Sequence, residues 1–265
     1  MLEIERTVRF CLRSDGSLNA EAPIDNSFAA WPPMEELGRY YELVVVCVGQ
    51  ADPVTGYFLN IKTIDQAVRR DALPLVSQTV QAQTPVGRLM GQLFEALRKS
   101  LGDVVASVAL VLSPTYAVRM EQDHADRLLV SQRYEFAAAH RLHAESLADE
   151  ENRRVFGKCN NRHGHGHNYQ LEVTVHAPAD GSVPVGAAEM DRVVAEAVID
   201  KLDHKNLDLD VPEFKQMTSS VENIARVIYR MLDQPVRDHG WGLDQVRVWE
   251  TSKTVCTYRG EGVTA

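Results

Sequence analysis

Two histidines separated by one glycine, His165-Gly166-His167, lie where the sequence enters an apolar, strand-like stretch. Side chains two residues apart on a strand point to the same face, so both imidazoles can reach one ion. His140, at the end of an earlier strand-like run, offers a third nitrogen. Three histidines with an open fourth position are typical of a catalytic zinc site. Hydrogen bonding at a strand edge is the alternative interpretation, and His143 and His163 are rival ligands.

A cysteine and an acid–imidazole pair suggest proton transfer. Cys159 stands six residues before His165 and next to Lys158. A thiol near a metal ion and a lysine ionises readily, which suits a general base or a nucleophile; a buried, inert thiol is the alternative. The pair Asp203-His204 follows a helix-like stretch. A carboxylate that orients an imidazole tunes it for proton transfer, although such a pair also caps a helix end.

Glu250 interrupts an apolar, strand-like run that begins at Val246. Alternation along a strand can simply expose such a carboxylate to solvent. A carboxylate can also accept two hydrogen bonds from the amidine-like edge of a ligand. From the sequence, Glu250 is therefore either a solvent-exposed surface residue or a residue that binds a ligand.

These residues must be positioned by sheets and helices, and the chain shows a faint internal repeat. Residues 40–46 resemble residues 168–174, and both stretches suit β-strands. A short strand at 57–61 and a helix at 62–75 are predicted after the first stretch, and a helix at 187–202 after the second. The pattern Ser-x-x-Glu from Ser219 predicts a capping box at the start of another helix.

Each half closes with two strand-like runs, at 104–112 and 116–121 and again at 245–250 and 254–259. The sequence therefore predicts an α+β protein with two domains, 1–125 and 126–265. Each domain is expected to be an antiparallel four-stranded sheet with two helices on one face. Open edges of such sheets favour pairing with a neighbour, which predicts a homo-oligomer.

The composition excludes several classes of protein. The 265 residues carry a formal net charge of −9, which opposes attraction to nucleic acid or to an anionic membrane. No apolar run has the length of a membrane span, and the first residues lack the order of a secretory signal, so we expect a cytoplasmic protein. Four scattered cysteines do not form a disulfide scaffold. A phosphorylated substrate would need a local basic patch.

Five blocks together resemble the 6-pyruvoyltetrahydropterin synthase family. The blocks are residues 136–143, 149–152, 156–161, 164–169 and 202–207. Their order and spacing are specific, and the resemblance covers about residues 130–261. The first half is similar to a second copy that has lost its chemistry, since Leu37 and Arg39 stand in the places of His165 and His167. We therefore expect no zinc in residues 1–125.

The resemblance implies a role for each candidate residue. His140, His165 and His167 would be the zinc ligands, and Cys159, Asp203 and His204 the proton-transfer groups. Glu250 would grip the pterin ring, helped by Ser220 and Glu222. The resemblance also implies tandem tunnelling-fold (T-fold) domains, in which sheets from several subunits form a barrel with the active sites at subunit interfaces.

The implied reaction converts 7,8-dihydroneopterin triphosphate into 6-pyruvoyltetrahydropterin and inorganic triphosphate, with Zn²⁺ as a Lewis acid. Lys158, Arg162 and Lys205 are candidates for phosphate contact from their charge alone. A related enzyme of queuosine biosynthesis, 6-carboxytetrahydropterin synthase, is the first alternative; the five residues between Cys159 and His165 favour the pyruvoyl product. A non-catalytic pterin-binding or metal-binding module is the second, with Cys159 as a fourth ligand that closes a structural zinc site. Retention of the Asp-His pair argues against that module.

Overall fold

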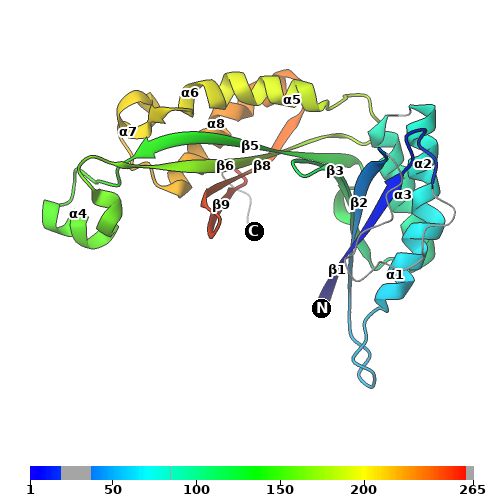
Figure 1. Ribbon diagram of the computed structural model, residues 1–265. Coiled ribbons are helices and arrows are strands. Elements are labelled where there is room, and N and C mark those ends of the chain that lie inside the picture. Colours follow the sequence, from blue (N-terminus) through cyan, green and yellow to red (C-terminus); the bar gives the residue numbers. More distant parts are fainter. Residues whose placement is uncertain (19–36, 84, 261–265) are drawn as a thin grey trace. The chain divides into compact units, whose positions relative to one another are not determined.

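The computed structural model describes residues 1–18, 37–83 and 85–260, which form two compact units. The first unit is Met1–Val130 with Ala177–Pro184, and the second is Ser131–His176 with Val185–Ala265. The N–H of Ala179 donates to the Asp126 carbonyl at 2.9 Å, so the turn around Ala179 packs with the first unit rather than with the second. Both units combine a mostly antiparallel sheet with helices, which confirms the α+β class (Figure 1).

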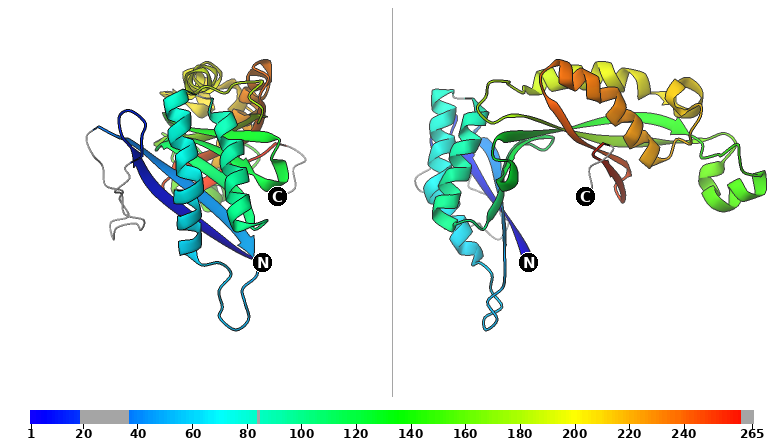
Figure 2. Two further views of the ribbon diagram at one scale, coloured as in Figure 1. Left: turned by 90° about the vertical axis from the view of Figure 1, so that its right-hand side faces the viewer. Right: turned by 180° about the vertical axis from the view of Figure 1, so that it is seen from behind.

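The first unit contributes four strands to the sheet and has helices on one face of them (Figure 2). Its strands follow the order β1 (Leu2–Leu12), β2 (Arg39–Gly49), β3 (Val105–Ser113) and β4 (Tyr116–Glu121). The helices are α1 (Ile61–Ala67), η1 (Val68–Ala72), α2 (Leu73–Ala82) and α3 (Val86–Leu101), and the short turn η2 (Gln122–His124) follows β4. Alternate residues of β1, among them Val8, Phe10 and Leu12, are buried, as expected for a strand with one covered face.

The predicted short strand at 57–61 is wrong. Ile61 instead begins α1, and the Asn60 side chain accepts the Lys62 N–H at 3.0 Å as the helix cap. The missing strand is β1, which pairs antiparallel with β2 from Leu2↔Gly49 to Leu12↔Arg39. An apolar run as short as 57–61 carries too little periodicity to separate a strand from a helix start.

A buried ion pair ties α1 to β1 in the first unit. Arg6 donates to both oxygens of Asp65, at 2.7 and 2.6 Å, and the Asp65 side chain is 8% exposed. Removing one partner of a buried pair costs about 3–5 kcal/mol. Because Arg6 is 27% exposed and can be partly rehydrated, we expect Asp65→Ala to lower the free energy of unfolding by about 2 kcal/mol. Urea unfolding measures this loss.

A matched control lies on the surface of the same unit. Arg70, 70% exposed, pairs with Asp71. Exposed pairs contribute about 0–1 kcal/mol, so Arg70→Ala should leave the urea midpoint nearly unchanged. Equal losses in Asp65→Ala and Arg70→Ala would contradict a special role for the buried pair.

The second unit holds the strands β5 (Arg127–His140), β6 (His165–Pro178), β8 (Gly242–Thr251) and β9 (Thr254–Tyr258), in that order. β7 (Lys205–Asn206) pairs parallel with β5. The helical segments are α4 (Asp149–Phe156), η3 (Gly157–Asn160), α5 (Ala187–Val194), η4 (Ala195–Ile199), α6 (Asp200–Leu202), α7 (Leu207–Asp210), η5 (Pro212–Phe214) and α8 (Val221–Asp238). α5 and α8 lie over the same face of the sheet (Figure 1). None of the helices in the described segments is long and apolar enough to cross a membrane.

The two units share one plan of two strands, helices and two strands. Their central strands also bury equivalent positions, 128 residues apart: Leu43, Val45 and Cys47 in β2, and Leu171, Val173 and Val175 in β6. The internal repeat and the tandem T-fold duplication stay predictions. Leu37 is 93% exposed and Arg39 begins β2, so neither lies in the core of the first unit.

The start of α8 differs by one residue from the predicted capping box. Ser220, not Ser219, is the N-cap, and its hydroxyl accepts the N–H of Asn223 at 3.5 Å. Ser219 is fully buried and donates its hydroxyl to Asp208 at 2.6 Å. Only Ser219 completes the Ser-x-x-Glu pattern, but either serine can cap a helix, and the contact of Ser219 with Asp208 leaves Ser220 as the cap.

Candidate active site

Strand alternation brings three histidines onto the helix-covered face of the second unit. His140 follows the buried residues Phe136 and Ala138 on β5, and His165 and His167 precede the buried Tyr169 on β6. One ligand atom of each histidine lies within 4.8 Å of those of the other two. The ring centroids are 4.5 Å apart for His140 and His165, and 4.8 Å apart for His165 and His167. These three side chains form the histidine cluster.

The protonation of His140 follows from its partner. Its Nδ1 lies 2.7 Å from the carbonyl oxygen of Ser219, and the imidazole is completely buried. A carbonyl can only accept, so Nδ1 carries a hydrogen, and in the neutral imidazole Nε2 then presents the lone pair. That lone pair faces Nε2 of His165 at 3.1 Å. A buried backbone contact of this kind orients a metal-ligating histidine.

The cluster fits a zinc ion. Nδ1 of His165 and Nε2 of His167 are buried without a hydrogen-bond partner, and unsatisfied buried nitrogens are costly unless a ligand occupies them. Burial lowers the pKa of His165 and of His167, which favours the neutral form that metals bind. Neighbouring imidazoles lower both pKa values further, and the Glu250 carboxylate opposes this. Three neutral imidazoles are a donor set that zinc accepts.

These lowered pKa values predict the pH dependence of the metal-free protein. The unfolded chain binds protons first, near the ordinary histidine pKa of 6.5, so folding stability falls as the pH drops below that value and levels off below the folded pKa. We expect a lower free energy of unfolding at about pH 5.5 than at about pH 7.5. Denaturant titrations of the wild type and of a His165→Gln, His167→Gln double variant measure this. The double variant should show a weaker dependence over this range, and an unchanged slope would contradict the assignment.

Glu250 lies at the edge of the histidine cluster. On β8 it follows Trp249, which pairs with Gln170 of β6, so it shares a face with the buried Val248. Its Oε1 is 3.5 Å from Nε2 of His140 and 3.7 Å from Nε2 of His167. The side chain is 22% exposed, so one side of the carboxylate remains accessible. Glu250 is therefore placed to accept hydrogen bonds from a ligand that reaches the cluster.

Cys159 is held near the end of β5. It lies on η3, and its carbonyl accepts the N–H of Leu142, two residues after His140, at 2.9 Å. Its thiol is half-buried. Burial raises the pKa of Tyr169, and the charges of Glu250, Asp208 and Cys159 add to this effect.

Asp203 and His204 lie along another edge of β5. Asp203 accepts the N–H of Ala137 at 2.8 Å, and the N–H of His204 donates to the Ala137 carbonyl at 2.6 Å. Asp203 Oδ2 is 2.7 Å from His204 Nδ1. The bond from Ala137 and then that from His204 hold the pKa of Asp203 below its ordinary value. The His204 side chain is 83% exposed and lines an open hollow with Gly166 and Asn168. His167 of the histidine cluster lines the same hollow as His204, and no hydrogen bond in the described part of the chain joins this pair to the three histidines.

The remaining predicted residues are the two pterin-binding candidates and the two rival ligands. Ser220 is engaged as the cap of α8 and directly follows Ser219, whose carbonyl contacts His140. Glu222 is exposed on the first turn of that helix; burial raises the pKa of Cys256, and the charge of Glu222 adds to this effect. His163 is exposed, and His143 Nδ1 contacts the Asn160 amide at 3.1 Å, so neither rival ligand joins the cluster.

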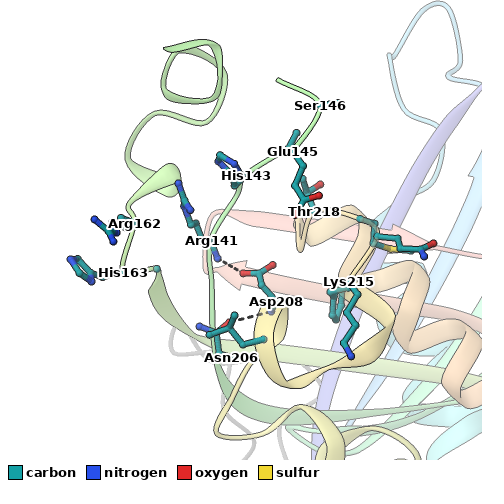
Figure 3. Close-up of a pocket in the computed structure, with 16 residues that line it drawn as sticks. Arg141, His143, Glu145, Ser146, Arg162, His163, Asn206, Asp208, Lys215 and Thr218 are labelled. Carbon is teal, nitrogen blue, oxygen red and sulfur yellow. Dashed lines mark hydrogen bonds between the residues drawn. The ribbon is translucent and has the colours of Figure 1, made fainter. Parts of the chain in front are cut away.

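Sequence reasoning missed two residues that support the cluster. The Ser219 carbonyl holds His140, and the Ser219 hydroxyl donates to Asp208 Oδ1 at 2.6 Å. Asp208 Oδ2 accepts the N–H of Arg141 at 2.5 Å, so the carboxylate joins the start of α8 to the end of β5 (Figure 3). The only signal in the sequence is the position of Asp208 directly after the block at 202–207.

The second half of the chain is similar to known proteins of one family. The sequence profile of the family described as 6-pyruvoyl tetrahydropterin synthase matches residues 129–261. The human 6-pyruvoyl tetrahydrobiopterin synthase is 47% identical over 135 residues, which cover 50% of this chain and 91% of that protein. The 6-carboxy-5,6,7,8-tetrahydropterin synthase of Haemophilus influenzae is 22% identical and matches 49% of this chain and 97% of that protein. The solved structure of the Caenorhabditis elegans 6-pyruvoyl tetrahydropterin synthase is 36% identical, with a TM-score of 0.48 over 51% of this chain and 96% of that one. The chain belongs to the 6-pyruvoyl tetrahydropterin synthase family.

Proposed function

We propose that this protein converts 7,8-dihydroneopterin triphosphate into 6-pyruvoyltetrahydropterin and inorganic triphosphate, with zinc as its cofactor. The observation that carries the proposal is the histidine cluster with Glu250 at its edge, in a chain of this family. His140, His165 and His167 would hold the ion. When bound there, zinc supplies Lewis-acid polarisation of the side-chain hydroxyls of the substrate.

The chain's own residues would bind and orient the pterin. The carboxylate of Glu250 accepts hydrogen bonds from the N–H groups of the ring, a charge-assisted and bidentate contact. Because Glu250 also lies within 3.7 Å of two histidines, this contact directs the side chain of the substrate to the histidine cluster. Cys159 is then the general base that removes a proton from a side-chain carbon.

Asp203 and His204 would complete the site of a neighbouring chain. The two residues are hydrogen-bonded to each other, as a proton relay requires, yet His204 is 83% exposed. An exposed relay, in a hollow that is open to a neighbouring molecule, suits a homo-oligomer with its sites at subunit interfaces. In that arrangement the pair moves protons while the enol form of the substrate tautomerises and triphosphate leaves.

The 6-carboxytetrahydropterin synthase reaction starts from the same substrate and gives a different product. The higher identity to the human pyruvoyl enzyme, 47% against 22% for the bacterial carboxy enzyme, favours the pyruvoyl product.

Turnover of 7,8-dihydroneopterin triphosphate by the zinc-loaded protein, with products resolved by mass, tests the proposal. A pyruvoyl pterin with released triphosphate is the expected result. A carboxypterin with acetaldehyde would move the protein to the other reaction, and pterin binding without turnover would support a binding module instead.

A further inference from the structure

Basic side chains gather where the chain leaves β5 and enters β6. Two hollows, of about 750 and about 890 Å³, lie there and share Arg141, His143 and Arg162 in their linings. The larger hollow adds Arg153 from α4 and Lys158 from η3, and the smaller one adds Lys215 from the segment after η5. Figure 3 shows Arg141, His143 and Arg162 on one side of the smaller hollow and Lys215 on the other. The five Lys and Arg residues form the basic cluster.

Three carboxylates also line the two hollows, Glu145 and Asp208 in the smaller one and Asp149 in the larger one. Within the described part of the chain, no member of the basic cluster forms an ion pair, and Arg141 Nε donates only to the Asn160 carbonyl, at 3.3 Å. Both oxygens of Asp208 are occupied, by a backbone N–H and by the Ser219 hydroxyl. In contrast, Arg154, the neighbour of Arg153 on α4, pairs with Glu151 at 3.2 Å. A local positive field is unusual in a chain with a net charge of −9, and it attracts anions.

Hydrogen bonds from two asparagine side chains to the backbone fix the segments that carry the basic cluster. The buried Asn152 side chain accepts the N–H of Ala144 at 2.8 Å and donates to the Leu147 carbonyl at 2.9 Å. Asn160 donates to the Leu142 carbonyl at 2.7 Å. Gly164 has φ +70°, and a Cβ there would lie 3.0 Å from the His140 carbonyl oxygen, so the segment passes close against the end of β5. Such preorganisation lowers the entropic cost of binding.

We infer that these two hollows bind an oligophosphate, with Arg141, Arg162 and Arg153 as the principal contacts. The inference rests on the proposed function, because the substrate proposed there carries a triphosphate. The guanidinium fork suits bidentate contact with phosphate oxygens. Arg141 follows His140, and Gly164 of the smaller hollow precedes His165, so the phosphates would lie next to the histidine cluster. Lys205, a candidate from the sequence, lines a different hollow with His204 and is not part of this site.

Inorganic triphosphate is the probe. We would measure its dissociation constant for the zinc-loaded protein by calorimetry in excess Mg²⁺, with the zinc content checked before and after each titration. Arg162→Gln and Arg153→Gln change exposed side chains and are not expected to affect folding. Each should weaken binding by about tenfold, the effect of losing one charge-assisted contact. Arg154→Gln, with the same change of charge on the same helix, should leave binding at the wild-type level.

The outcomes separate this inference from the proposed function. If Arg162→Gln and Arg153→Gln bind triphosphate like Arg154→Gln and leave the KM for the pterin substrate unchanged, the inference is wrong, even where turnover is observed. If turnover is absent while triphosphate binding depends on Arg162 and Arg153, the oligophosphate site stands and the synthase reaction does not. Arg162→Lys, which keeps the charge and loses the fork, should give an intermediate dissociation constant.

Discussion

Replacing His167 with alanine should remove zinc from the protein and abolish turnover. His167 supplies one of three imidazoles whose ligand atoms lie within 4.8 Å, and the remaining two do not make a catalytic zinc site. Loss of a residue that only supports a ligand already weakens metal binding 10–100-fold, so loss of a ligand itself should cost at least about a hundredfold in zinc affinity. Metal analysis after dialysis and competition with a chelating dye measure this effect.

His163→Ala is the matched control. His163 stands four residues before His167, was a rival ligand in the sequence, and is exposed. Its removal should leave both the zinc content and turnover unchanged. Zinc loss in His163→Ala, with retention in His167→Ala, would overturn the assignment of the histidine cluster.

Replacing Cys159 with alanine should lower turnover by about 10²–10⁴-fold, the usual contribution of a general base. The zinc content should stay at the wild-type level, because Cys159 lies outside the group of histidine nitrogens. The pair of readouts separates the two roles that the sequence left open. A general base affects the rate alone, whereas a fourth zinc ligand affects metal retention as well. Steady-state kinetics and metal analysis on the same preparation decide between them.

Cys256→Ala provides the comparison for this variant. Cys256 lies on β9, and burial raises the pKa of its thiol, so it is less reactive than an ordinary cysteine. Turnover should be unchanged by its removal. Zinc loss in Cys159→Ala would exclude the assignment of Cys159 as a base alone.

Much of the site follows from local sequence. Period-two alternation places His165 and His167 on one face of a strand wherever that strand lies, because neighbouring side chains of a strand point to opposite faces. The strands at 245–250 and 254–259 and the helix at 187–202 likewise depend on periodicity within a few turns. These features needed no tertiary information, and the α+β class follows from them.

The predictions of secondary structure and of the helix cap are wrong where contacts between distant residues determine the conformation. β1 is a strand because it pairs with β2. The segment at 57–61 belongs to no described strand, and its last residue, Ile61, begins α1. Ser219 and Ser220 are chemically identical, yet the first turns toward Asp208 and the second caps α8. Local propensity does not distinguish such alternatives, because the energy that separates them comes from residues distant in the chain.

The sequence by itself determined which residue types are available for chemistry and, through the strand period, that His165 and His167 share one side of β6. Only the tertiary structure decided which residues meet: Ser219 against His140, Glu250 beside two histidines, and the basic cluster assembled from separate segments. It also fixed the Asp203-His204 pair against β5, by hydrogen bonds to the backbone of Ala137. The physical reason is that strand alternation acts over two residues, whereas these contacts depend on how sheet and helices pack across tens of residues of chain.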